Sequence, residues 1–341
     1  SNMKTLNINK LTILFGLFLI SVFFTTSSSA AGFCTANGSG VITIANSTSP
    51  ISSTVASDDI AAGSARNDCS VTPAIYKLKI YKFGVCTKDP DLNDLSSCQM
   101  IFVKAAGVDI DIQAGVSATL PIPEFYIEPG TYPYMYVQLS NNLGMKWTAT
   151  MSSAVTGADA SGTAGAGTTC WTTNTRRVNR YQAASGSNAV TTVHGASGIS
   201  TAKSIDCGNS SDFASGYTFT YEVMARFIED DADQNPIYCA TALATNGDYI
   251  DFVEAEGTGQ TRGVNTVSLL NATDGFATSC ADSAKIAWTT ALVTPYTITE
   301  DSKFTMNIAA TSSNDIEFLS SANKTIWKII SGAPKISLVV N

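Results

Sequence analysis

The chain has 341 residues, with 20 Lys and Arg against 28 Asp and Glu, a formal net charge of −8 and 14% charged residues. The acidic balance disfavours nucleic acid and anionic membranes as partners, because both require clustered Lys and Arg. So low a charged fraction leaves a neutral surface rich in small and hydroxyl residues, which is common in exported structural β proteins and compatible with sugar binding.

The first thirty residues predict a secretory signal peptide. Lys4 and Lys10 precede or open an apolar run over residues 11–24, and small residues follow up to Ala30. The run has about fourteen residues, fewer than the roughly twenty that span a bilayer, which disfavours an uncleaved anchor. Ser1 and Asn2, ahead of Met3, are interpreted as a cloning remnant. We therefore expect a secreted protein, extracellular, at the cell surface or periplasmic, with no transmembrane span after cleavage.

Cleavage removes two of the 20 basic residues and no acid, so the mature chain is expected to carry a net charge of −10. The 8 cysteines all lie beyond residue 30, and oxidising export makes disulfides the expected state. Cys86 and Cys98 are close enough to staple one hairpin. We expect the further pairs Cys34–Cys69, Cys170–Cys207 and Cys239–Cys280, among 105 possible connectivities. A His- or Cys-ligated metal is disfavoured, because the chain has no CxxC motif and a single His.

Residues 31–72 are predicted to be an N-terminal arm or edge strand around the apolar patch 41–44. Residues 73–151 form a first β region with strands at 76–80, 99–103, 108–112 and 132–139. In 76–80, strict alternation places Leu78 and Ile80 inward and the lysines outward.

Residues 152–211, which are rich in Ser, Gly and Ala, are predicted to be a loop or linker, and the three arginines within 176–180 are interpreted as solvated. Residues 212–341 form a second β region. Its expected elements are a long strand at 217–227, a hairpin around Asn246-Gly247, and strands at 267–270, 286–292, 296–299, 304–309, 315–319, 325–330 and 335–340. The whole pattern predicts an all-β fold: an antiparallel β-sandwich, immunoglobulin-like or jelly-roll-like with Greek-key connections, in one or two domains.

Two acidic segments have the spacing of calcium loops, because alternate residues of a curled loop direct oxygens inward and Ca²⁺ takes six to eight of them. The first comprises Asp89, Asp91, Asn93 and Asp94, and the second Asp231, Asp233 and Asn235. Neither has the Gly or the distal Glu of an EF-hand, and a solvated acidic turn is the alternative. We expect no required cofactor, and calcium is the one candidate ligand that these segments suggest.

Tyr132, Tyr134 and Tyr136 share one face of the strand 132–139 and form a candidate glycan- or partner-binding ladder, the alternative being a ladder buried under a second layer. The sequence has no GxSxG elbow, no HExxH and no GxxxxGK(S/T) phosphate loop, and its single His disfavours a Ser-His-Asp triad. A glycoside hydrolase needs only two carboxylates, and the strand-borne candidates are Asp109, Asp111, Glu222, Asp251, Glu254 and Glu256.

The sequence therefore favours an exported, non-catalytic structural subunit of a cell-surface filament, layer or matrix. Self-association or contact with other surface proteins is expected, either by strand addition through 41–44 or the C-terminal strand, or between basic and acidic segments. The alternatives are a monomeric adhesin or glycan-binding module and, behind it, a carboxylate-based glycoside hydrolase.

Overall fold

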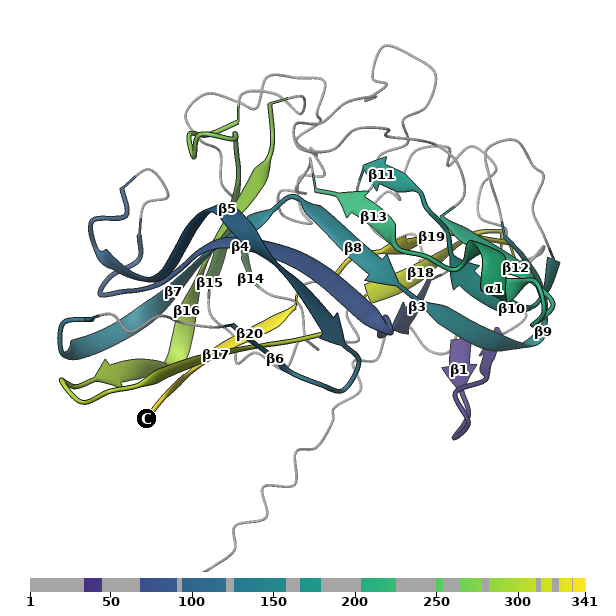
Figure 1. Ribbon diagram of the computed structural model, residues 1–341, viewed down its shortest axis with the longest axis horizontal. Helices are drawn as coiled ribbons and strands as arrows, with labels where there is room; N and C mark the ends of the chain where they lie inside the picture. Colours follow the sequence, from purple (N-terminus) through teal and green to yellow (C-terminus); the bar gives the residue numbers. More distant parts are fainter. Residues whose placement is uncertain are drawn as a thin grey trace, which may run out of the picture.

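The computed structural model describes residues 34–44, 68–90, 94–120, 126–157, 166–178, 204–224, 250–253, 264–277, 282–310, 314–320, 325–332 and 334–341. Over these ranges the chain is almost entirely β-strand, with one short helix, α1 (Phe213–Gly216). The predicted fold class is confirmed: the protein is an all-β, disulfide-stapled sandwich. Figure 1 shows a long twisted sheet lying over two smaller groups of strands.

Nine of the described strands form the largest sheet. Its order is β11 (Arg176–Val178), β13 (Thr220–Val223), β8 (Asn142–Lys146), β4 (Ile75–Cys86), β7 (Gly130–Ser140), β16 (Lys285–Ile298), β15 (Val264–Leu270) and β14 (Ile250–Val253), with β5 (Cys98–Gln113) also paired to β4. The pairings are antiparallel except for the short one between β11 and β13. The long central strands therefore carry most of the sheet.

The sheet forks at Asn141. β7 and β8 follow one another along β4 with only this residue between them, but β7 pairs onward with β16 and β8 with β13. Asn141 is fully buried. Its N–H donates to the carbonyl of Ala284 (3.1 Å), and its carbonyl accepts from the N–H of Met224 (2.7 Å). Its side-chain amide donates to the Ser283 carbonyl (3.1 Å). Asn141 thus bonds to the chain just before β16 and just after β13, at the point where these two strands diverge.

The second layer has two groups of strands. Eight described strands form one sheet, in the order β1 (Cys34–Ala36), β2 (Ile42–Ile44), β9 (Thr148–Gly157), β19 (Thr325–Ile330), β18 (Asn314–Ser320) and β3 (Asp68–Val71), with β10 (Ala166–Thr172) and β12 (Ile205–Gly208) added beside β9. Three more, β20 (Lys335–Val340), β17 (Phe304–Ala309) and β6 (Ala118–Leu120), form the other sheet. The pairings of β9 with β2 and β19 are parallel and short.

Disulfides hold this architecture at three points. Cys34–Cys69 joins β1 to β3, the two edge strands of the eight-stranded sheet, so the sheet curls on itself and a covalent bond closes it. Cys86–Cys98 links directly opposed residues of β4 and β5, and Cys170–Cys207 does the same for β10 and β12. Three predicted pairs are therefore confirmed. The fourth, Cys239–Cys280, lies outside the described residues.

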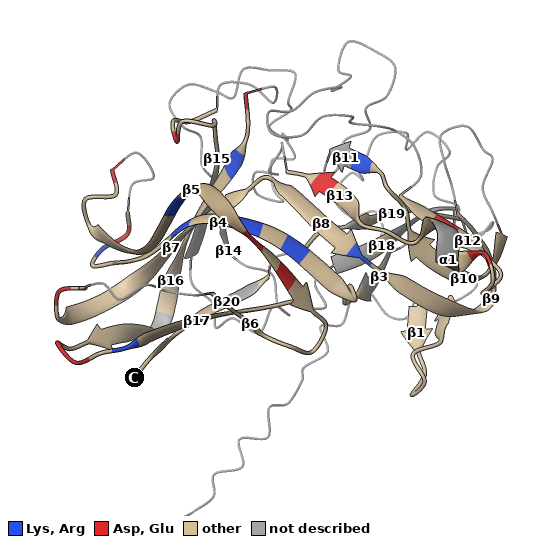
Figure 2. Ribbon diagram, viewed as in Figure 1, with Lys and Arg blue, Asp and Glu red and all other residues tan. Residues whose placement is uncertain are grey.

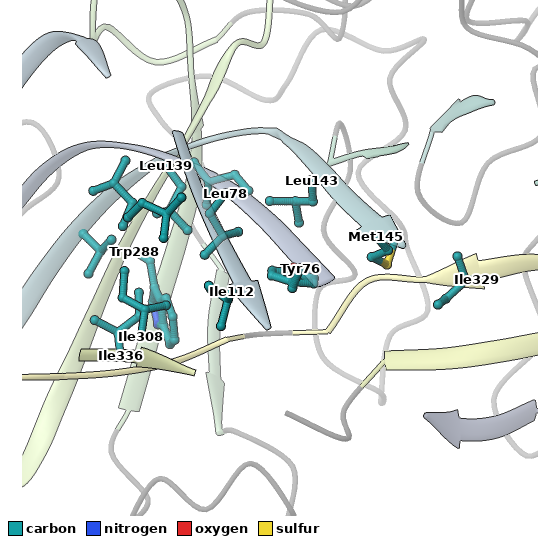
Figure 3. Close-up of a cluster of buried hydrophobic side chains, with 14 of the residues drawn as sticks. Tyr76, Leu78, Ile112, Leu139, Leu143, Met145, Trp288, Ile308, Ile329 and Ile336 are labelled. Carbon is teal, nitrogen blue, oxygen red and sulfur yellow. The ribbon is translucent and has the colours of Figure 1, made fainter. Parts of the chain in front are cut away.

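One apolar core fills the space between the layers. Tyr76, Leu78 and Ile80 of β4 expose 1%, 0% and 0% of their surface, as the alternation predicts. Figure 3 shows Trp288 beside Ile308 and Ile336 at one side of this core, with Met145 toward Ile329 at the other. Each fully buried side chain of this size contributes roughly 1.5–3 kcal/mol. The core is therefore the main source of stability.

A polar tether fixes the chain where it passes from β19 to β20, that is, from one group of strands to the other. The Tyr76 hydroxyl donates to the carbonyl of Gly332 (2.9 Å). The carboxylate of Glu222, which exposes 3% of its surface, accepts from both the N–H and the hydroxyl of Ser331. Burial, together with the charge of Glu222, raises the pKa of the Tyr76 phenol. The phenol therefore stays protonated and remains a donor.

Several strand predictions are confirmed, with 304–309, 325–330 and 335–340 matching β17, β19 and β20. The apolar patch 41–44 forms β2, which pairs with β1 and β9. The segments 99–103 and 108–112 are one strand, β5, bent at Gly107, whose φ is 70°. The segments 286–292 and 296–299 are likewise one strand, β16, with an irregularity between Ala291 and Tyr296. Pro295 lies there and has no N–H to give to the ladder.

Two regions differ from the prediction. Residues 152–211 contain the end of β9 together with β10, β11 and β12, so the described part of this segment belongs to the sheets. Its small residues permit close backbone approach: a Cβ on Gly167 would overlap the backbone of Gly208. Of the strand predicted at 217–227, residues 220–223 form β13 and residues 217–219, which follow α1, are not in a strand; residues 225–227 lie outside the described ranges. The hairpin around Asn246-Gly247 also lies outside them.

Candidate functional site

An open hollow of about 500 Å³, here called the basin, lies on the outer face of the nine-stranded sheet at the fork. It is lined by Lys77, Leu78, Lys79, Tyr81, Ala105, Ala106, Asp109, Ser140, Asn142, Arg176, Tyr221, Ala272, Ala284 and Lys285. Since Leu78 and Ile80 are buried inward, the intervening side chains of β4 must face outward. The divergence of β13 from β16 leaves room beside them. The volume falls in the usual range of ligand pockets, roughly 300–1,000 Å³.

A continuous row of residues crosses five strands beside the basin. The register places Lys77 of β4 opposite Asp111 of β5 on one side and opposite Gly144 of β8 on the other. Gly144 is opposite Tyr221 of β13, which is opposite Arg176 of β11. A Cβ on Gly144 would lie 3.0 Å from the Cβ of Lys77 and 3.0 Å from a ring carbon of Tyr221. The glycine therefore leaves room for the Lys77 side chain on one side of it and the Tyr221 ring on the other.

Cations and aromatic rings alternate over this face. Lys77 lies 4.5 Å from the ring centre of Phe219, Lys146 lies 4.4 Å from that of Tyr217, and Arg176 lies 5.0 Å from that of Tyr221. Lys285 lies 4.5 Å from the ring centre of Tyr81. Such contacts contribute about 0.5–1 kcal/mol each at exposed sites. The rings thus hold the cations in place without neutralising them.

Asp274 organises the far side of the basin. Its carboxylate accepts from the Nζ atoms of Lys82 and Lys285, each at 2.7 Å. The backbone of Asp274 has a φ of 70°, and the Asn271 side chain holds that turn by accepting from the N–H groups of Thr273 and Gly275. Burial alone would raise the pKa of Asp274, but hydrogen bonds and charge from Lys285 and Lys82 outweigh it and hold the pKa below its ordinary value.

Among the described residues, the resulting surface has an excess of positive charge. We define the basic face as Lys77, Lys79, Lys82, Lys146, Arg176 and Lys285. Its carboxylates are Asp274 and, in longer ion pairs, Asp111 (3.4 Å from Lys77) and Asp109 (3.7 Å from Lys79). Exposed pairs of this length are weak. In Figure 2 the blue segments of β4, β8 and β11 lie over the same part of the sheet. The basic face therefore suits an anionic partner, in a protein that is acidic overall.

Acidic residues gather at the opposite end of the long strands. β4 ends, β7 begins and β16 ends at the same edge, because Cys86 is opposite Tyr134, and Gly130 is opposite Ile298. The loops there carry exposed carboxylates, seen as red loop tips at the left of Figure 2. We define the acidic end as Asp89, Asp94, Glu128, Glu300 and Asp301; its described cations are Lys88 and Lys303. The molecule is thus electrically polar along its strands.

The first predicted calcium segment forms part of this acidic end. Asp89 and Asp94 are exposed on the turn after β4, whereas Asp91 and Asn93 lie outside the described residues. Asp94 accepts from the N–H of Ser96 (3.0 Å), and its hydrogen bonds to Ser96 lower the pKa of its carboxyl group. Asp231, Asp233 and Asn235 also lie outside the described residues, within which no cluster of three or more potential metal ligands occurs. Calcium binding stays a prediction, and a change in melting temperature on EDTA addition would test it.

The predicted tyrosine ladder is largely covered. Tyr132 and Tyr136 each expose 1% of their surface, and Tyr134 is half-buried. The Tyr132 hydroxyl donates to the carbonyl of Glu128 (2.7 Å). Tyr136 packs with Cys86, Leu270 and Ala287 in a small cluster separate from the main core. The structure therefore favours the buried alternative for two of the three rings and leaves Tyr134 partly accessible.

The carboxylates considered for a hydrolase are dispersed. Asp109 and Asp111 lie two residues apart on β5 and form the ion pairs with Lys79 and Lys77. Glu222 is buried on β13 and bonded to Ser331. The side chain of Asp251 is not described, and Glu254 and Glu256 lie outside the described residues. The described carboxylates thus bind cations or fix the fold.

Comparison with protein-family models, with curated proteins and with solved structures finds no significant match for this chain. The function must therefore be argued from the site alone. Sequence reasoning placed Lys77 and Lys79 outward but did not single out the basin, whose residues come from strands far apart in sequence. No helix among the described residues is long and apolar enough to cross a membrane.

Proposed function

We propose that this protein is an exported, non-catalytic subunit of a cell-surface assembly whose copies associate head to tail. The observation that carries the proposal is the separation of charge, with the basic face at one end of the long strands and the acidic end at the other. A contact between two different patches of identical molecules propagates into a ring or a filament. Opposite potentials would steer and orient that contact.

The covalent chemistry suits such a role. Three disulfides indicate an oxidising compartment, extracellular or periplasmic. They hold the sheets without any dependence on a ligand. Over the described residues, the basic face and the acidic end offer complementary charge for such a contact.

Two strand edges are less suited to strand addition than the sequence implies. β2 already has a partner on each side within its own chain. On β20, the outward N–H of Leu338 donates to the hydroxyl of Tyr296 (3.0 Å). A ladder added at these edges would have to displace existing hydrogen bonds. The charged surfaces are therefore the better contact.

Negative-stain electron microscopy and light scattering on the purified mature protein, at low and high ionic strength, test this proposal. We expect rings or filaments at 20–50 mM salt that dissociate at roughly 0.5 M, because the Debye length falls from over 10 Å to about 4 Å. A monomer at every salt concentration and at high protein concentration would refute it.

A second candidate function is the binding of an acidic glycan in the basin. The basin lining carries Lys77, Lys79 and Lys285, which suit a uronate carboxylate. It also carries the rings of Tyr81 and Tyr221, which offer flat apolar area with a polar tip to a sugar. Saturable binding of a polyuronate to a protein that stays monomeric would favour this function.

A further inference from the structure

We propose that the basin of one copy receives the Glu300–Asp301 turn of a second copy. This inference rests on the proposed function and names its contact: the turn between β16 and β17 is the knob, and the basin is the socket. It concerns only two of the acidic residues at that end of the molecule, so it makes a sharper claim than general charge attraction.

The knob is a preformed turn. The N–H of Thr299 donates to the hydroxyl of Ser302 (2.9 Å), and the N–H of Ser302 donates to the carbonyl of Thr299 (3.2 Å). Below the turn, Lys303 and Asn341 exchange backbone hydrogen bonds of 2.7 and 2.9 Å. Glu300 and Asp301 are exposed in this turn, which connects the nine-stranded sheet to the three-stranded one. Two adjacent carboxylates are thus presented on a rigid support, which reduces the entropy lost on binding.

The other acidic loops of the same end are poorer knobs. Asp94 accepts a hydrogen bond from the N–H of Ser96 within its own turn, and Asp89 lies five residues away from it in sequence. Glu128 stands alone, and its N–H donates to the side chain of Gln99 (2.9 Å). Glu300–Asp301 is the one described place on this end where two carboxylates are neighbours in sequence.

The socket matches a pair of carboxylates. Lys77 and Lys79 are two residues apart on the outward face of β4, with side chains 31% and 36% exposed. Their own carboxylate partners are 3.4 and 3.7 Å away, so an incoming oxygen can compete for the ammonium hydrogens. Arg176, oriented over Tyr221, adds a planar donor suited to a carboxylate. Lys285, at the start of β16, lines the opposite side of the basin.

Geometry requires the knob and socket to come from different molecules. Lys77 is the third residue of β4 and Cys86 is its last, so the two lie roughly 30 Å apart at the rise of an extended chain. The knob lies beyond the Cys86 end. A turn whose base is fixed by backbone hydrogen bonds cannot fold back over that distance. The contact is therefore heterologous and repeats along a line of copies.

A charge-swap experiment tests this contact. Glu300→Lys/Asp301→Lys reverses the knob, and Lys77→Glu/Lys79→Glu reverses the socket. Each protein alone should associate at least tenfold more weakly than the wild type in sedimentation at 50 mM salt. An equimolar mixture should regain association, because each reversed socket meets a reversed knob and each normal socket a normal knob. The matched control, Asp89→Lys/Glu128→Lys, makes the same charge change at the same end and should associate within threefold of the wild type.

Each outcome decides one claim. If the wild type assembles but knob reversal has no greater effect than the control, the knob assignment is wrong and the proposed function stands. If the wild type remains monomeric at every salt concentration, both are wrong, and polyuronate binding by that monomer would favour the second candidate function. Should the socket variant misfold, as judged by circular dichroism and melting, Lys79→Gln replaces it. That variant and the exposed knob variant then each have to weaken association for the proposal to hold.

Discussion

A single missing Cβ sets the spacing of the basic face. Gly144 lies between Lys77 and Tyr221, and an added methyl group would lie 3.0 Å from atoms of both. Neither contact is with the end of a flexible chain, since one atom is a Cβ and the other belongs to a ring. The row of residues from Asp111 to Arg176 therefore depends on glycine at this position.

Gly144→Ala should destabilise the protein by about 1–3 kcal/mol, the usual cost of overpacking a tight contact. Chemical denaturation with urea measures the change. Gly38→Ala is the matched control, because nothing lies within 4 Å of a Cβ at Gly38. That variant should be neutral or slightly stabilised. Equal effects of the two substitutions would contradict the packing described at Gly144.

Asp274 makes a second prediction at the residue scale. Asp274→Asn keeps a side chain tolerated at positive φ but leaves Lys82 and the largely buried Lys285 without their shared carboxylate. We expect a loss of about 1–3 kcal/mol near neutral pH, between the cost of breaking an exposed and a buried pair. Asp111→Asn, at an exposed pair, should cost less than about 1 kcal/mol.

The pH dependence of this loss follows from the lowered pKa of Asp274. A carboxyl group whose folded pKa is depressed adds stability that is complete above its unfolded pKa of about 3.9 and disappears as pH falls through the folded value. The stability difference between wild type and Asp274→Asn should be constant from about pH 5 to 8 and shrink below about pH 4. Unfolding curves across this range measure it, and a difference that grows in acid would contradict the assignment.

Among the elements, the closure of the eight-stranded sheet by Cys34–Cys69 is the most consequential. The bond spans 35 residues and joins strands at opposite edges, whereas Cys86–Cys98 spans 12 residues within a hairpin already paired along its length. Cys34→Ala/Cys69→Ala should cost about 2–5 kcal/mol. That is about 1 kcal/mol more than Cys86→Ala/Cys98→Ala, from the longer loop released. The reverse order in urea denaturation would show that the curl does not need the covalent link.

Individual strands also show which features the sequence predicts and which it does not. Alternation places Leu78 and Ile80 in the core because a period of two is local information, and the three short C-terminal strands follow from β-branched runs between turn residues. The basin could not be predicted. It needs the pairing of β4 with β8 and of β13 with β11, whose paired residues lie more than forty positions apart, and a fork at Asn141 that no local pattern marks. From sequence alone, Arg176 is interpreted as a solvated loop residue, whereas the structure places it opposite Tyr221 in the pairing of β11 with β13.

At the scale of the whole molecule, the composition conceals the important feature. The net charge of −10 expected for the mature chain predicts general repulsion between copies, yet over the described residues the charge is divided between a basic face and an acidic end. Repulsion keeps the bodies apart while the two patches attract, which favours end-to-end contact over aggregation. The apparent association constant should therefore fall at least tenfold between 50 and 300 mM salt. Sedimentation velocity measures this, and an increase with salt would point to an apolar contact instead.

Zero-length carbodiimide cross-linking of mixed ¹⁴N- and ¹⁵N-labelled protein tests the central claim most directly, because it joins only carboxylates and amines already in contact. We predict amide bonds from Glu300 or Asp301 to Lys77 or Lys79, half of them between differently labelled copies. Intermolecular links confined to other residues, or none in a sample that has assembled, would contradict the account.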